Sequence, residues 1–167
     1  MEISELLVDS FGRVRELYVA TADDLDLEVA HRRPSGTGNP IVWLLWHTAR
    51  VQDDHVCGLS GGQQAWHSGW SEKLGLPFEE GAIGYGQSSE EVDAVRVDRI
   101  QDLVDYHQAV HQLTLDYVEG LDAADLDRIV DRHWTPPVTA GARLVSVLGD
   151  CLQHLGQAAY VKGLPEA

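Results

Sequence analysis

The stretch LVSVLGDCLQHLGQAAYV, residues 144–161, decides how this chain folds. Its apolar side chains recur every three or four positions and cover most of the circumference of a helix, whereas a half-exposed strand would alternate. Thr139, shortly before it, can cap the first turn by accepting a backbone N–H. We therefore expect this segment to be the most buried helix of the protein.

Three further segments share this helical period and are separated by proline and glycine signals. Helices are expected at Ile3–Thr21, about Pro40–Cys57 and about Val97–Glu119. Asn39 can cap the second of them, because its side chain accepts an unpaired backbone N–H and the following proline has none to lose. No segment alternates convincingly like a strand, so we predict an all-α four-helix bundle that forms one domain over residues 1–167.

Two long irregular stretches interrupt the predicted bundle, one between the second and third helices and one before the fourth. Residues 58–87 contain eight of the sixteen glycines together with four aromatic residues. Loops of this length in a small domain usually form part of a functional site. We expect this one to form an ordered pocket wall that includes Trp66, Trp70 and Tyr85. Ser88 and Glu91 have the spacing of a capping box, which predicts a short turn before the third helix.

The charge balance limits the partners of the protein. The sequence has 12 basic and 27 acidic residues, a formal net charge of −15. A nucleic-acid-binding protein gathers basic side chains on one face, so binding to nucleic acid or to an anionic membrane is not expected. No apolar run approaches the roughly 20 residues that span a bilayer, and the acidic N-terminus does not resemble a signal peptide. With Cys57 and Cys151 expected as small buried hydrophobes, these features predict a cytoplasmic protein.

Polar residues inside apolar helices are the candidates for chemistry, because burying them requires a partner. Asp150 and His154 lie four residues apart and therefore project from one face of the fourth helix, with Gln157 continuing the row. His47 follows an apolar run in the second helix and is expected to point inward. Two side chains at this spacing and one imidazole from a facing helix can form a three-ligand metal site. The same spacing also fits a hydrogen-bonded core histidine and an aspartate that only orients His154.

Other catalytic arrangements have weaker support. His107 and His111 also have i, i+4 spacing, but the third helix is rich in acidic residues, which favours a solvated face for one of these histidines. Cys151 has no neighbour that would activate its thiol. The serines lack a strand-turn-helix elbow and the glycine-rich loop lacks a phosphate-binding lysine pattern, so acyl transfer and nucleotide binding are not indicated.

Two longer motifs resemble a known family. They are WLLWHTARV, residues 43–51, and DCLQHLGQAAYVKG, residues 150–163. Together they resemble the DinB-like superfamily, and the resemblance extends over nearly the whole chain. Four shorter stretches resemble the actinobacterial branch that includes mycothiol-dependent S-transferases; they are VQDDHV (51–56), GYGQSSEEV (84–92), WTPPVT (134–139) and RLVSV (143–147).

The resemblance implies a fold and a metal. The fold is an up-down-down-up four-helix bundle, often dimeric, and the metal is a divalent ion held by three histidines. His47 and His154 match two of the ligand positions, and Asp150 stands at the third. A carboxylate there shifts the preference modestly toward harder ions. Zn²⁺ is still expected first, and Ni²⁺ or Mn²⁺ are the alternatives that the carboxylate favours.

The activity implied by the resemblance is transfer of a low-molecular-weight, mycothiol-like thiol to a small electrophile, with the metal lowering the thiol pKa. In that case Trp66, Trp70 and Tyr85 line the co-substrate pocket, and Asp54 and Gln157 support the metal ligands. Two alternatives stay open. One is a stress-response bundle that binds a metal or small ligand without turnover, and the other is a thiol-dependent isomerase with the same metal.

Overall fold

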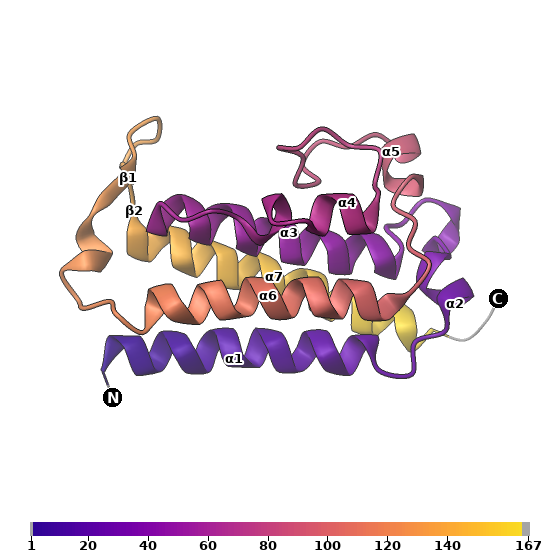
Figure 1. The fold of residues 1–167 in the computed structure, drawn as a ribbon, viewed down its shortest axis with the longest axis horizontal. Helices are drawn as coiled ribbons and strands as arrows, with labels where there is room; N and C mark the ends of the chain where they lie inside the picture. The colour runs from indigo at the N-terminus through magenta and orange to yellow at the C-terminus, as the bar shows by residue number, and fades with distance from the viewer. Residues whose placement is uncertain (1, 165–167) are drawn as a thin grey trace.

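A computed structural model describes residues 2–164 of the protein (Figure 1). The predicted helical character is confirmed, since four long helices make up about half of the chain: α1 Ile3–Ala22, α3 Ile41–Ser60, α6 Ile100–Val118 and α7 Ala140–Lys162. Both α3 and α1 pack against α6 and α7, so the four helices enclose one core. Within residues 2–164 no helix is long and apolar enough to cross a membrane. Met1 and residues 165–167, which belong to the predicted domain, lie outside the described residues.

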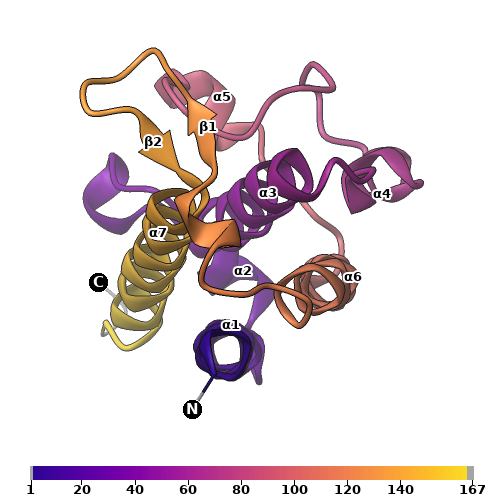
Figure 2. The ribbon, with the colours of Figure 1, turned by 90° about the vertical axis from the view of Figure 1, so that its left-hand side faces the viewer.

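The most buried helix is α3, so the prediction that residues 144–161 form the most buried helix is wrong. Sixteen of the 20 residues of α3 are buried, against seven of the 23 residues of α7. Figure 2 shows α3 in the middle of the molecule, among α6, α7 and the short helix α4 (Trp70–Leu74). On the outer side of α7, Val145 and Tyr160 are 68% and 71% exposed. Burial depends on the neighbours that surround a helix, and its own apolar content does not determine them.

The predicted helix caps are confirmed at two helices and wrong at a third. The Thr139 side chain accepts the backbone N–H of Ala142 at the start of α7. Ser88 forms the predicted capping box with Glu91 at the start of the short helix α5, Ser89–Asp93. Asn39 does not cap α3, because Pro40 has an extended backbone with ψ 159° and itself occupies the cap position.

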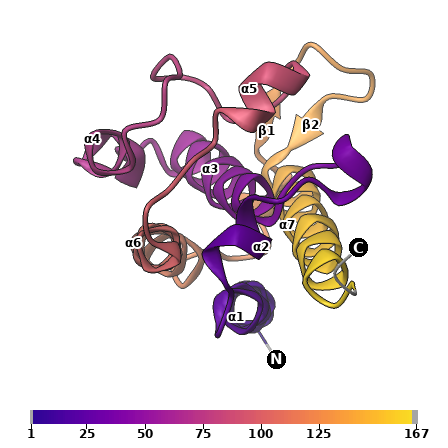
Figure 3. The same ribbon diagram turned by 90° about the vertical axis from the view of Figure 1, so that its right-hand side faces the viewer.

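Several short elements lie in stretches predicted to be irregular. The expectation of no strands is wrong, because β1 (Ile129–Asp131) pairs antiparallel with β2 (Val138–Thr139) directly before α7. Strands of two or three residues are too short to show an alternating pattern. The helix α2 (Leu27–His31) begins after an Asp26 cap and lies between α1 and α3 at one end of the bundle (Figure 3). The helix α4 interrupts the glycine-rich stretch.

Candidate metal centre

Three side chains from two helices meet beside the buried end of α3. His47 comes from α3, and Asp150 and His154 come from adjacent turns of α7. One potential ligand atom of each lies within 4.8 Å of the other two. The His47 side chain is 2% exposed, and those of Asp150 and His154 are 22% and 20% exposed. The cluster is therefore closed on the α3 side and accessible from the α7 side.

The Asp150 carboxylate lies between the two imidazoles without bonding to either. Its Oδ2 is 3.8 Å from Nε2 of His47, and its Oδ1 is 3.7 Å from Nε2 of His154. Both distances exceed the range of a hydrogen bond. Oδ2 is nonetheless buried, and it has no hydrogen-bond partner among residues 2–164. A buried carboxylate oxygen without a partner is costly, so the geometry fits a cation held between the three side chains.

The far nitrogen of each imidazole is held by an oxygen acceptor. Nδ1 of His47 lies 2.5 Å from the Ile83 carbonyl oxygen, and Nδ1 of His154 lies 2.9 Å from Oε1 of Gln157. An amide or peptide oxygen only accepts, so Nδ1 carries the proton and donates in both rings. The unprotonated Nε2 atoms therefore face Asp150. Metal-ligating histidines in proteins are oriented in this way.

Burial also keeps His47 in the form that binds metals. Desolvation is the largest effect on its imidazole and lowers the pKa below the ordinary value of 6.5, and the neighbouring His154 acts in the same direction. The Ile83 carbonyl and the Asp150 carboxylate oppose this lowering. At neutral pH the ring is therefore uncharged and has a free lone pair.

Aromatic rings and a glycine enclose His47. Trp43 stacks on the imidazole at 4.6 Å between centroids, and Tyr85 meets it edge-on at 5.2 Å. Between them runs Gly84, with φ of +103°. A Cβ on Gly84 would lie 2.5 Å from Nδ1 of His47. Only glycine both adopts this backbone conformation and lets the chain approach the ring so closely.

Of the residues predicted to line or support the site, Tyr85 and Gln157 lie at the cluster. Asp54 lies seven residues after His47 on α3, about 10 Å further along the helix axis. It accepts a hydrogen bond from Gln64 and lines a hollow of about 370 Å³ that Arg143 also borders. The hollow therefore lies further along the same α3 and α7 surfaces.

Trp66 and Trp70 lie elsewhere, contrary to the prediction that they wall the same pocket. Both rings pack against Tyr106 of α6, at 5.5 and 5.7 Å, and Trp66 also covers the Arg50 guanidinium. Large apolar rings of the loop are more stable in the seam between α3 and α6 than at an open site.

Trp43 was not identified from the sequence as a site residue, although it stands one helical turn before His47. The sequence contained no signal for the Ile83 carbonyl.

The second histidine pair belongs to the core. His107 stacks on Tyr18 at 4.0 Å, and both His107 and His111 are buried, so the expected solvated histidine is not found in this pair. Burial lowers the pKa of His107 to about 3. Among the described residues, the three-ligand group is made by His47, Asp150 and His154 and does not include this pair.

The cysteines are buried as predicted. Burial raises the pKa of Cys57 to about 12 and raises that of Cys151 further. Burial therefore favours the protonated thiol, which is the less nucleophilic form.

Comparison with known proteins identifies a family and a similar solved structure. A family model described as the DinB superfamily matches residues 10–158. A crystal structure of a conserved protein from Enterococcus faecalis superposes with a TM-score of 0.89 and 31% sequence identity. The alignment covers 97% of this chain and 96% of the Enterococcus chain. A search of curated proteins found no match.

Proposed function

Because this chain belongs to the DinB superfamily, we propose that it is a divalent-metal-dependent S-transferase. It conjugates a low-molecular-weight thiol of the mycothiol type to a small electrophile. One observation carries the proposal: a buried Asp150 oxygen, without a hydrogen-bond partner among residues 2–164, lies between two imidazoles whose lone pairs face it. This arrangement fits a cation better than it fits a set of core hydrogen bonds.

The donor set of two nitrogens and one carboxylate oxygen suits a small divalent ion. Zn²⁺ accepts imidazole and carboxylate together, and three protein ligands leave a position for substrate. Ni²⁺ and Mn²⁺ are the alternatives, since a carboxylate favours harder ions. When bound, the metal supplies a Lewis acid that lowers the pKa of a thiol coordinated to it.

The surrounding residues orient the ligands and control access. Ile83 and Gln157 retain the protons on the Nδ1 atoms, so both Nε2 atoms stay free. Trp43 shields His47 from water on one face of its ring. Burial raises the pKa of Tyr85, and the Asp150 charge adds to the effect, so the phenol stays protonated and can donate a hydrogen bond to substrate. The thiol enters from the side of α7, where Asp150 and His154 are accessible.

Metal analysis tests the site before any assay of activity. We expect about one metal ion per chain in untagged protein reloaded with Zn²⁺, Ni²⁺ or Mn²⁺, and loss of the ion in Asp150→Ala and His154→Ala. The matched control is His133→Ala, because the side chain of His133 is 95% exposed and contacts Asp131 rather than any of the three ligands. Wild-type protein that binds none of the three metals would refute the proposed centre.

Thiol conjugation then tests the reaction. Metal-loaded protein is incubated with a bimane electrophile and mycothiol, bacillithiol or glutathione, and the thioether is measured by mass spectrometry. We expect conjugate with the wild type and with His133→Ala, and none above background with Asp150→Ala. A stoichiometric metal without conjugate for any thiol would indicate a binding bundle or a thiol-dependent isomerase and would exclude the S-transferase.

We also propose that the chain forms an up-down-down-up bundle that pairs as a homodimer. Leu17 of α1 and Leu152 of α7 are 46% and 42% exposed and line one apolar hollow of about 480 Å³ with Ala20 and Leu148. A second copy that covers this surface would bury these side chains. Light scattering is expected to give twice the chain mass of 18.4 kDa, and a mass equal to one chain would refute the dimer.

A further inference from the structure

We infer that Arg50 is a positioning residue for the metal centre and that it acts through the loop that holds His47. Arg50 lies one turn after His47 on α3 and is fully buried. Its Nε donates to the Ala82 carbonyl oxygen at 3.1 Å. The next carbonyl along the chain, that of Ile83, accepts the bond from Nδ1 of His47. This inference rests on the proposed metal centre, since it concerns the orientation of one of its ligands.

The partner of Arg50 holds the other end of the same loop. Asp53 accepts the backbone N–H groups of Ala65 and Trp66 at 2.9 and 2.8 Å, and the Tyr106 hydroxyl at 2.8 Å. Arg50 and Asp53 form an ion pair at 3.6 Å. One buried pair on α3 therefore anchors the loop at residues 65–66 and again at residue 82. We call residues 65–84 the anchored segment.

An arginine suits this position because its donors point in different directions. Besides Ala82, Arg50 binds Oε1 of Gln64 through Nη1 at 2.9 Å, and the Tyr106 hydroxyl lies 3.3 Å from Nη1. The Trp66 ring covers the guanidinium, with 4.8 Å from Cζ to the ring centroid. A lysine could satisfy the charge of Asp53 but has no planar fork to bond Ala82 and Gln64 together. The cost of removing two charges from water largely offsets the attraction between them, so a buried ion pair adds little to stability. We therefore attribute to this pair the placement of the loop rather than a gain in stability.

The orientation of His47 depends on this anchor. Stacking on Trp43 sets the plane of the imidazole, but a 180° flip about the Cβ–Cγ bond keeps that plane while it puts Cδ2 in place of Nδ1 and Cε1 in place of Nε2. Only a polar group at one edge distinguishes the two orientations, and that group is the Ile83 carbonyl. The anchored segment thus determines that Nε2, and not Cε1, faces Asp150, and that Nε2 is the nitrogen without a proton.

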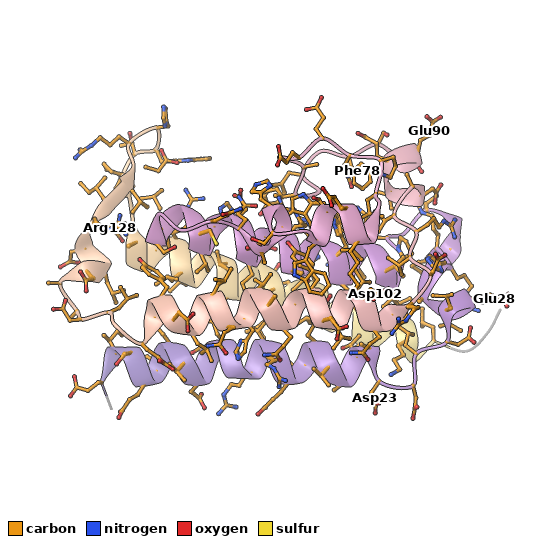
Figure 4. The ribbon with its side chains drawn as sticks, viewed as in Figure 1. Asp23, Glu28, Phe78, Glu90, Asp102 and Arg128 are labelled. Atoms are coloured by element: carbon orange, nitrogen blue, oxygen red, sulfur yellow. The ribbon has the colours of Figure 1, made fainter. Side chains whose placement is uncertain are left out.

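The test is the Arg50→Lys variant, which keeps the buried charge opposite Asp53 but removes the bond to Ala82. The control is Arg128→Gln, which removes another bond from an arginine to a backbone carbonyl, that of Leu59. Figure 4 shows Arg128 near one end of the molecule and Phe78, a residue of the anchored segment, in the other half. Two readouts are used. Long-range ¹⁵N–¹H NMR of metal-free protein reports which nitrogen of His47 carries the proton, and competition with a chelating dye reports the Kd for Zn²⁺.

In the wild type and in Arg128→Gln we expect His47 to be protonated on Nδ1 alone. We also expect these two proteins to have the same Kd for Zn²⁺. In Arg50→Lys we expect a mixture of tautomers and Zn²⁺ binding weakened by about 10- to 100-fold, the usual effect of losing a hydrogen bond that orients a ligand. If Arg50→Lys does not fold, the double variant Arg50→Met with Asp53→Asn removes both charges, keeps an amide oxygen for the backbone N–H groups of the loop and carries the same expectations. A wild-type tautomer and Kd in a folded variant would overturn the inference.

The two readouts separate this inference from the proposed function. If the wild type binds no Zn²⁺, the metal centre is refuted. If the His47 tautomer nevertheless differs between the wild type and Arg50→Lys, the role of Arg50 in positioning His47 is supported. Tight Zn²⁺ binding that is unchanged in Arg50→Lys would support the metal centre and refute the positioning role.

Discussion

Asp150→Asn is expected to stabilise the metal-free protein while abolishing metal binding. The carboxylate is partly buried, and its Oδ2 has no hydrogen-bond partner among residues 2–164. An unsatisfied buried polar group costs about 1–3 kcal/mol. Because the Asp150 side chain is 22% exposed, we expect the lower end of that range, about 1 kcal/mol. For a protein of this size that is a rise in Tm of about 2–4 °C. The asparagine has nearly the same shape, but its amide N–H groups can donate to the Nε2 lone pairs, whereas a carboxylate can only accept, so the cost is removed.

Added metal should reverse the order of stability. At a free Zn²⁺ concentration 100 times its Kd, the wild type gains about 2.7 kcal/mol, and the variant gains nothing. Thermal unfolding followed by circular dichroism, with chelator and then with Zn²⁺, measures both differences. His133→Asn serves as the control, because it alters an exposed side chain and should leave both curves unchanged. If metal-free Asp150→Asn were less stable than the metal-free wild type, Asp150 would be a structural hydrogen-bonding residue, and the reasoning would be refuted.

Two further predictions concern the loop and the core. Gly84→Ala should lose about 1–3 kcal/mol of stability and bind metal more weakly, because its Cβ would lie 2.5 Å from Nδ1 of His47. Gly86→Ala is the control, because Gly86 also has a positive φ but a Cβ there would have nothing within 4 Å. Chemical denaturation of the two variants separates the steric clash from backbone strain. Equal losses of stability would contradict a clash with His47. His107, whose pKa falls to about 3 on folding, binds a proton more readily in the unfolded chain, so stability should decrease as pH falls below 6.5. Urea unfolding at pH 7 and pH 5 should show about 2 kcal/mol less stability at pH 5 from this residue. In His107→Gln this loss of stability between pH 7 and pH 5 should be absent. An unchanged pH dependence in the variant would show that His107 does not cause the loss.

Local features of the chain could be predicted because they depend only on neighbours in sequence. The helical period located four long helices, and the caps at Thr139 and Ser88 follow from side chains that bond to the backbone three residues away. The spacing of Asp150 and His154 places both on one face of α7 for the same reason. The inward direction of His47 follows from the apolar run before it.

The remaining features depend on which segments meet, and the sequence alone does not contain that information. Residues 144–161 and α3 are both apolar, yet only α3 is enclosed, because the glycine-rich loop and α6 cover the side that α7 leaves open. That loop turns Trp66 and Trp70 toward Tyr106 and brings Tyr85 to His47. The group that orients His47 is a backbone carbonyl 36 residues away, and every residue has such a carbonyl. A short-range pattern can therefore predict the ligands, but only the tertiary structure selects the groups that hold them in place.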